Sequence, residues 1–501
     1  MNNLDILQKY FSSGSAAQEK SFISDVFVIS DNFQEIILPA ENSIRLLVGS
    51  KGSGKSALLE YLSQKCEKEN IPALNLSPID IELDNIDEDI ASSVLIRKIY
   101  KAIVREIAIK VGLGLGGAIS NEQKSLVEAA VDSGARQPTM TDSLLRVLMP
   151  IGKAVSQIDF EKMLPDYSTS TRTFVSAINN TLPKQGKIFY ILFDDVDLFG
   201  NAGSSHYIDT IWCAILALKI LAERLPNVRV IVTLRNEIWR RIRDGRKNQR
   251  DQVDHVRPMI CYLQPTSNDM KNILTRRLMF CKTFLEKPDG NDCFLPFFDG
   301  IDCKMPSSNE RRFWEDYLVT ASRERPRDTV QLVQHLVKHA LHTGHAKIND
   351  NDVEQTALQY SEERVDDLVN ENSDLCPQLE TVIRAFATIS FQSSAEDVKE
   401  LLLGVPGRGA ITISGKAIKP DNMDDMFKLW GILYDIEFLT PRAKDNSQRK
   451  GFSHIRPYED STLVSAQRWN DMQKYIWEVH PCYRSYLINI WNKNRKMKSL
   501  Y

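Results

Sequence analysis

The sequence predicts an α/β fold in its N-terminal half, with a mostly parallel sheet that carries helices on both faces. Three observations predict it. Apolar runs of strand length alternate with longer segments of helical periodicity. The runs are mostly apolar and are separated by helices, as expected for strands of a parallel sheet that is covered on both faces. One run leads directly into a glycine-rich loop at 49–56, a usual arrangement at the edge of such a sheet.

The elements of this half follow one another in a regular order. Residues 1–40 predict a short N-terminal helix and a linker into the core, which spans 41–265. The polar segment of about 112–165, interrupted by glycine and proline, is interpreted as an insertion into this core. Strands are expected at 44–48, 71–76, 187–193, 228–234 and 259–263, and helices at 57–62, 90–111 and 207–224.

The C-terminal half has a different pattern. From about 266 to 370 the periodicity is helical throughout. Residues 371–501 form a mixed region, with helices expected at 395–403 and 423–433. A β-hairpin with a basic, turn-rich tip is expected to begin at Phe438. We therefore expect a third segment at 266–370 and a fourth at 371–501.

The composition is that of an ordinary globular protein. Of the 501 residues, 43% are hydrophobic and 26% are charged, and the net charge of −3 gives no whole-protein argument for nucleic-acid binding. The eight cysteines include no CxxC pair, which argues against a zinc module or a disulfide framework. No signal peptide is evident, and no stretch reaches the roughly 18 uninterrupted apolar residues of a membrane span. We expect a soluble, cytoplasmic protein without a membrane partner.

The glycine-rich loop has the residues that a phosphate site requires. Its backbone must turn N–H groups toward a phosphate chain, in conformations that a Cβ would obstruct, and the following helix adds positive charge. Lys55 is expected to contact the β- and γ-phosphates of ATP, and the Ser56 hydroxyl to bind Mg²⁺. The alternative is a fortuitous glycine-rich turn. The predicted nucleotide-binding residues are Gly49, Ser50, Lys51, Gly52, Ser53, Gly54, Lys55, Ser56 and Ala57.

A phosphate loop also needs an acidic residue that holds the metal, at the tip of a neighbouring strand. Asp194 ends the apolar run 187–193, and it is therefore predicted to bind Mg²⁺, directly or through water. Asp195 is the catalytic candidate that orients or deprotonates the attacking water; alternatively, it caps the following helix. Asp197 is more typical of a structural cap.

Arg235 directly follows the strand expected at 228–234, so it should emerge at the same sheet edge as Asp194 and Lys55. A guanidinium there could contact the γ-phosphate and distinguish ATP from ADP. The alternative is a surface arginine. Basic residues are dense between 235 and 250, which is typical of a solvated helix, an oligomer contact or a nucleic-acid contact, and these interpretations stay open.

These motifs together resemble the AAA+/STAND-type division of P-loop ATPases. The resemblance rests on the loop 49–56, on the strand that ends in Asp194-Asp195-Val196-Asp197, and on Leu234-Arg235-Asn236-Glu237-Ile238-Trp239. Bacterial origin-recognition-like and KAP-like ATPases are similar groups, and several of them act in defence against phage. Many AAA+ enzymes have Asp-Glu where this chain has Asp-Asp, as STAND- and KAP-like proteins often do. This departure suggests slow hydrolysis, suited to a switch.

The resemblance covers roughly residues 40–370 and implies a helical lid at 266–370. Leu263-Gln264-Pro265-Thr266-Ser267 is similar to the linker into such a lid. Arg325-Pro326-Arg327-Asp328 is similar to the segment with the lid arginine that contacts the nucleotide. Arg327 is the preferred candidate because it begins a helix after the rigid Pro326, and Arg325 is the second. Either could instead pair with a carboxylate on the lid surface.

The region 371–501 is similar to a winged helix, the module that origin-recognition-like ATPases carry after the lid. The predicted fold is therefore a mostly parallel P-loop NTPase sheet with helices on both faces, followed by a helical lid and a winged-helix-like C-terminal domain. Basic residues of the hairpin could hold nucleic-acid phosphates, or the wing could contact protein. These residues are Arg442, Lys444, Arg449, Lys450 and Arg456.

These residues and the resemblance predict a Mg²⁺-dependent ATPase that acts as a molecular switch. Its nucleotide state would be coupled to a protein effector or to self-association, and the resemblance suggests a role in bacterial antiphage defence. One alternative is a DNA-binding ATPase of the initiator or repair type. Another is a scaffold that binds nucleotide without hydrolysing it.

Overall fold

The computed structural model describes residues 2–29, 36–37, 39, 41–81, 90–113, 121–133, 166–182, 188–199, 206–245, 254–286, 292–445 and 451–498. The chain divides into two compact units. The core unit contains Ser15–Gln264, and the C-terminal unit combines Met1–Gly14 with Pro265–Tyr501. Each unit buries its own set of apolar side chains.

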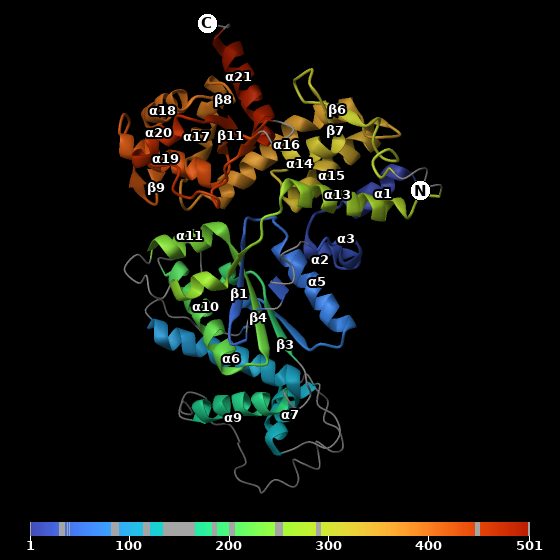
Figure 1. Cartoon of the computed structure of the whole chain (residues 1–501), viewed down its shortest axis with the longest axis vertical. Helices are drawn as coiled ribbons and strands as arrows, with labels where there is room; N and C mark the ends of the chain where they lie inside the picture. Colours follow the sequence, from blue (N-terminus) through green and yellow to red (C-terminus); the bar gives the residue numbers. More distant parts are fainter. Residues whose placement is uncertain are drawn as a thin grey trace. The chain divides into compact units, whose positions relative to one another are not determined.

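A five-stranded parallel sheet forms the centre of the core unit (Figure 1). Its strand order is β2-β3-β4-β1-β5, and all four pairings between neighbouring strands are parallel. The strands are β1 Ile44–Gly49, β2 Ala73–Leu76, β3 Phe189–Phe193, β4 Val228–Arg235 and β5 Ile260–Tyr262. Every predicted strand is present, close to its expected bounds, and the predicted fold class is confirmed.

The helices of the core unit connect and flank these strands. They are α2 Ala16–Glu19, α3 Ile23–Val26, α5 Lys55–Lys68, α6 Ser92–Leu113, α7 Asn121–Asp132, α9 Asp166–Thr181, α10 Tyr207–Arg224 and α11 Asn236–Gly245. The three predicted helices are confirmed as α5, α6 and α10. Helix α7 lies within the predicted insertion and packs against α6 and α9, with Leu126 and Ala130 buried. Residues 114–120 and 134–165 of that insertion lie outside the described residues.

Alternation along the strands divides the buried side chains between two apolar layers. Ile44, Leu46 and Val48 of β1 belong to the larger cluster, which includes side chains of α6, α10 and α11. Leu47 belongs to the second cluster, with side chains of α5. Because successive side chains of a strand point to opposite faces, each face of the sheet receives its own helical cover. Figure 1 shows α5 on one side of the sheet and α10 on the other.

The C-terminal unit contains mostly helices and short antiparallel strands. Its helices are α1 Asn3–Tyr10, α13 Ser267–Lys282, α14 Trp314–Ala321, α15 Pro326–Thr343, α16 Asp350–Glu371, α17 Leu379–Ala385, α18 Ala395–Gly404, α19 Met423–Asp435, α20 Trp469–Met472 and α21 Arg484–Lys498. Its strands are β6 Asp302–Lys304, β7 Arg311–Phe313, β8 Gln392–Ser393, β9 Thr412–Ile413, β10 Lys416–Ala417, β11 Leu439–Lys444, β12 Phe452–His454 and β13 Ile476–Val479.

Two features of this unit differ from the sequence-based expectation. Helix α1 packs against α13 and α15, and Tyr10 stacks on Phe284 at a ring-centroid distance of 4.9 Å. The structure therefore groups the N-terminal helix with the C-terminal unit. The region 266–370 is not helical throughout, because β6 and β7 form an antiparallel hairpin. Strands of three residues are too short to show a period of two in the sequence.

The last part of the unit has the predicted winged-helix-like order. Helices α18 and α19 precede the β11–β12 hairpin, as expected, and the hairpin joins a four-stranded antiparallel sheet of order β12-β11-β13-β8. Trp430 of α19 and Trp477 of β13 are fully buried and meet edge to face at 4.7 Å. Residues 446–450, at the tip of the hairpin, lie outside the described residues.

A buried ion cluster in this unit joins α15, α16 and the turn that precedes α15. Asp328 of α15 accepts from Arg323 Nε at 2.6 Å and from Arg364 Nη1 of α16 at 2.8 Å. All three side chains are almost completely buried. Burial by itself raises the pKa of Asp328, but the charges of Arg323 and Arg364 outweigh this and hold the pKa below its usual value.

Replacing Asp328 by Asn should lower the free energy of unfolding of the C-terminal unit by about 3 kcal/mol, because two buried guanidinium groups then lose their counter-charge. Because the folded pKa of Asp328 is depressed, its stabilising contribution is present at neutral pH and is lost as the pH falls below about 4. Urea denaturation followed by tryptophan fluorescence measures both effects. Asp366→Asn, at an exposed position of α16, should change stability by less than about 0.5 kcal/mol. Equal losses in the two variants would contradict the role given to Asp328.

Candidate functional site

At several positions of the loop between β1 and α5, only glycine fits the backbone conformation or the space beside it. Gly52 and Gly54 adopt φ angles of +81° and +98°, in the left-handed region. A Cβ on Gly49 would lie 2.6 Å from Ser53 Oγ and 2.7 Å from the Leu263 carbonyl oxygen. Gly54 is the N-cap of α5, so the amides of the first helical residues have no carbonyl one turn earlier to which they could donate. The first amides of α5 therefore lack an intrahelical partner and lie beside the loop.

Lys55 is folded over this loop. Its Nζ donates to the carbonyl oxygens of Gly49 at 2.8 Å and Ser50 at 2.9 Å. Burial lowers the pKa of Lys55 to about 8, and the charges of Glu237, Asp197 and Asp194 only partly oppose this. The hydroxyl of Ser53 is buried and has no hydrogen-bond partner among the described residues. A buried hydroxyl without a partner is a group that a ligand or a water would satisfy.

The predicted metal ligand Asp194 follows β3 and is held in place by β4. Thr233 Oγ1 donates to Asp194 Oδ1 at 2.5 Å. The Asp195 amide donates to the same carboxylate oxygen and to Thr233 Oγ1, both at 3.0 Å. The strand order corrects one expectation, because β4 lies between β1 and β3 and the acid is therefore not on the strand next to the loop. The carboxyl ends of the three strands still meet at one edge of the sheet.

Asp195 directly follows Asp194 and lies close to two other carboxylates. Its φ angle is +51°, and it occupies the N-cap position of the short 3-10 helix Val196–Leu198. Its side chain makes no cap hydrogen bond, so the alternative role as a cap is met by its position and not by its carboxylate. Partial burial raises the pKa of Asp195, and the neighbouring charges of Asp194 and Asp197 raise it further. Arg235 and Lys55 act in the opposite direction. The loop lysine and the acidic pair therefore lie within electrostatic reach of each other.

Arg235 lies at the predicted edge, opposite Gly49 in the β1–β4 register. Its Nε contacts Asp197 Oδ2 at 2.8 Å, and about a third of the arginine side chain is exposed. Asp197 is buried, and its carbonyl oxygen accepts from Tyr207 Oη at 2.6 Å. Asp197 is thus the ion-pair partner of Arg235, a role that the sequence did not indicate.

Two other residues of the site were not predicted. Thr233 is a polar residue inside an apolar strand, which was the one available signal, but its contact with Asp194 depends on the pairing of β4 with β3. Asn236 Nδ2 donates to Ser50 Oγ at 3.2 Å and so connects the start of α11 with the loop. No local pattern marks such a contact in the sequence.

The two candidate lid arginines belong to the C-terminal unit and differ in their surroundings. Arg325 precedes α15 and is buried, with Nη1 3.8 Å from Glu371 Oε2. This is the carboxylate pairing that was the alternative role for it. Arg327 lies in the first turn of α15 and is half-buried. Its contact with a nucleotide stays a prediction.

The basic residues of the predicted wing are partly engaged within the protein. The Arg442 guanidinium lies 3.4 Å from the centroid of the Phe452 ring, and its Nε is 3.6 Å from Glu478 Oε2. Arg456 Nη2 contacts Glu324 Oε2 at 2.9 Å. Lys444 is exposed.

The other two basic residues of the wing, Arg449 and Lys450, lie outside the described residues. Contact of this hairpin with nucleic acid stays a prediction. All eight cysteines are free thiols, as expected from their spacing. None of the described helices is both long enough and apolar enough to cross a membrane.

Comparison with known proteins gives one partial family match and several remote structural likenesses. Residues 299–369 match the family described as the FunZ-associated C-terminal helical domain, FunZ_C. No curated protein matches the chain. The ORC2 protein of Aeropyrum pernix, in a structure of its ADPNP–ADP complexes, is 9% identical, with 96% of this chain and 94% of that chain covered and a TM-score of 0.38.

Two further structures are similar at the same level. Cdc6p from Pyrobaculum aerophilum is 10% identical, with 97% of this chain and 98% of that chain covered and a TM-score of 0.32. A structure of Drosophila ORC bound to DNA is 11% identical, with coverage of 96% and 91% and a TM-score of 0.31. The function is therefore argued from the geometry of the site itself.

Replacing Thr233 by Val should lower the free energy of unfolding of the core unit by about 1–3 kcal/mol, because the half-buried Asp194 carboxylate and the Asp195 amide lose a shared partner. Thr233→Ser keeps the hydroxyl and loses one methyl group, so its loss should be about 1 kcal/mol or less. Urea denaturation measures both variants. If valine is tolerated as well as serine, the hydroxyl does not hold the acidic pair.

Proposed function

We propose that the chain binds ATP with Mg²⁺ and hydrolyses it slowly, as a switch that couples nucleotide state to a partner. The observation that carries this proposal is that several functional groups meet at one sheet edge. They are the glycine loop with Lys55, the carboxylates of Asp194 and Asp195, and the guanidinium of Arg235. Phosphoryl transfer depends mostly on positioning and charge stabilisation, and these groups supply both.

The residues present fit a triphosphate and its metal. The loop offers amide donors, the Ser53 hydroxyl and a lysine, which together suit an anion with many acceptor oxygens. Ser56, the second residue of α5, and Asp194 offer the oxygen ligands that Mg²⁺ prefers. When bound, the metal would neutralise charge on the phosphates.

The protein's own groups would act as follows. Lys55 exchanges the carbonyl oxygens of Gly49 and Ser50 for phosphate oxygens. Thr233 keeps the Asp194 carboxylate oriented toward the metal position. Asp195, with its raised pKa, orients the attacking water or accepts its proton.

Arg235 is the residue that would respond to the nucleotide state in the proposed switch. In the structure its guanidinium contacts Asp197, and the γ-phosphate of ATP would compete for the same group. Loss of the γ-phosphate would return Arg235 to Asp197. Because α11 begins at Asn236, directly after Arg235, and contacts the loop through Ser50, this exchange is coupled to the position of α11. Arg327 is proposed as a further nucleotide contact from the C-terminal unit.

For the partner we propose a class only: it is either a protein effector or a second copy of this chain. The antiphage setting and the cytoplasmic location of the switch are proposed from the resemblance and the composition alone. The DNA-binding alternative gains no support from Arg442 and Arg456, since both contact carboxylates of the same unit. A measurement of ATP turnover distinguishes the scaffold alternative from the proposed switch.

Lys55→Ala should lose most of the affinity for ATP, whereas Asp195→Asn should keep the affinity and lose turnover by about 100-fold or more. Affinity is measured by titration with a fluorescent ATP analogue, and turnover by steady-state phosphate release. Lys68→Ala, at the exposed far end of α5, is the matched control and should change neither quantity.

Equal loss of binding in Lys55→Ala and Asp195→Asn would contradict the separate roles given to the two residues. Binding by the wild type without phosphate release would favour the scaffold.

The affinity for ATP should fall as the pH rises through about 8, because the unliganded Lys55 then loses its proton and binding must restore it. Below this pH the ammonium is already charged, so the affinity should be nearly constant. The titration is repeated at intervals between pH 7 and pH 9.5, where the slope should not exceed about tenfold per pH unit. Lys55→Met should bind weakly and without this pH dependence; a slope that persists in this variant would assign the titration to another group.

A further inference from the structure

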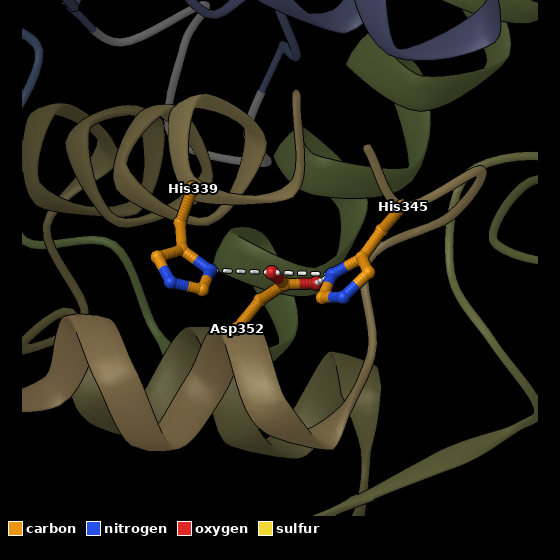
Figure 2. Close-up of side chains that lie close together, drawn as sticks. All are labelled: His339, His345 and Asp352. Atoms are coloured by element: carbon orange, nitrogen blue, oxygen red, sulfur yellow. Dashed lines mark hydrogen bonds and ion pairs between the residues drawn. The ribbon is translucent and has the colours of Figure 1, made fainter. Parts of the chain in front are cut away.

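A group of potential metal ligands lies in the C-terminal unit, in the segment 299–369 that matches the helical family. His339 Nδ1 is 2.6 Å from Asp352 Oδ1, and His345 Nδ1 is 2.9 Å from the same oxygen. One ligand atom of each residue lies within 4.8 Å of the other two. Figure 2 shows both imidazole rings directed at the carboxylate from opposite sides.

The turn between two helices brings these residues together. Helix α15 ends at Thr343, and Gly344 follows with a φ angle of +74°, which reverses the chain. The His345 amide donates to the Ala340 carbonyl oxygen at 2.8 Å, so His345 is held beside the last turn, close to His339. A residue with a Cβ is disfavoured in this left-handed conformation, and the glycine is therefore part of the arrangement.

Asp352 is positioned by the start of the next helix. Asn349 is the N-cap of α16, and its amide donates to Asp352 Oδ2 at 2.9 Å in a capping box. Oδ1 is directed at both histidines, and Oδ2 also lies 3.1 Å from His345 Nδ1. Two local motifs, the C-cap of α15 and the N-cap of α16, thus bring His339 and Asp352 together although they are apart in the sequence.

The buried Asp352 carboxylate has unusual ion-pair partners. The Asp352 side chain is completely buried, and its described ion-pair partners are the two histidines. Asp328, equally buried in the same unit, has two guanidinium groups. A buried carboxylate is costly without a compensating cation. Two imidazoles supply such a charge only when they are protonated.

We propose that His339, His345 and Asp352 form a binding site for a divalent transition metal of the Zn²⁺ class, with three protein ligands and a position open to water. Imidazole nitrogen with one carboxylate oxygen is a donor set that suits Zn²⁺ and its neighbours, in contrast to the oxygen-only sets of Mg²⁺ and Ca²⁺. The metal would bridge the end of α15 and the start of α16.

A metal requires the carboxylate oxygen to move away from both imidazoles, and it requires the two imidazole nitrogens, now within 4.8 Å of each other, to approach. Bonds of about 2.0–2.1 Å in a tetrahedral site place neighbouring ligand atoms roughly 3.4 Å apart. The present contacts of 2.6 and 2.9 Å would widen by less than about 1 Å. Each Nδ1 now donates to the carboxylate, so it would have to give up its proton to bind the metal, and each neutral imidazole would then carry its proton on Nε2. The histidine side chains are 23% and 26% exposed, which gives the cation a route from solvent and leaves room for a water ligand.

The Zn²⁺ affinity of the full chain tests this proposal, measured by competition with a chromophoric chelator. We expect one strong equivalent for the wild type, and at least tenfold weaker binding for His339→Ala and for His345→Ala, since even loss of a residue behind a ligand costs this much. His342→Ala is the matched control, because His342 is an exposed histidine in the last turn of the same helix. It should bind like the wild type.

X-ray absorption at the zinc edge of the unaltered protein is the second measurement, and it does not depend on the folding of a variant. Two imidazole ligands and further oxygen ligands are expected. Binding that is unchanged in both variants would place the metal elsewhere. Absence of a strong equivalent, or a spectrum without imidazole, would reduce the cluster to a hydrogen-bonded helix cap and overturn the proposal.

Discussion

The parallel pairing of β4 with β1 on one side and β3 on the other is the constraint on which the candidate site depends. It places Gly49 opposite Arg235 and Leu47 opposite Thr233, while Phe193 pairs with Val232, so that Asp194 emerges beside Thr233. A shift of one residue would turn Thr233 to the opposite face and separate it from the acid. The register is in turn held by burial, because β1, β3 and β4 place apolar side chains in the clusters on both faces of the sheet, and each face has its own helical cover. The chemistry of the sheet edge therefore rests on the packing of its two sides.

The balance of charge at this edge explains why the proposed ligands belong together. Lys55 and Arg235 face four carboxylates, those of Asp194, Asp195, Asp197 and Glu237. A polyphosphate alone would be repelled by this excess of negative charge, and a divalent cation would need more oxygen ligands than Asp194 and Ser56 provide. A nucleotide and its metal satisfy both requirements at once. In the proposed switch the arginine would exchange Asp197, which its Nε contacts at 2.8 Å, for the last phosphate.

The C-terminal unit buries carboxylates in two physically different ways. Asp328 is neutralised by guanidinium groups, which keep their charge at any physiological pH. Asp352 is surrounded by imidazoles, which carry charge only when protonated and which are also good metal ligands. The first arrangement is permanent and joins helices into one unit. The second depends on what else is bound, and this difference is the physical basis for assigning it a ligand.

The sequence by itself determined the features that are local in the chain. The strands were predictable because burial on both faces produces mostly apolar runs, and the loop was predictable because its glycines, Lys55 and Ser56 are contiguous. The edge position of Asp194 and Arg235 followed from their places directly after two strands. Only the tertiary structure decided the contacts between Thr233 and Asp194, between Arg235 and Asp197, and among His339, His345 and Asp352. These contacts depend on strand register and on turn geometry, and both are set by long-range packing that no single segment of the sequence records.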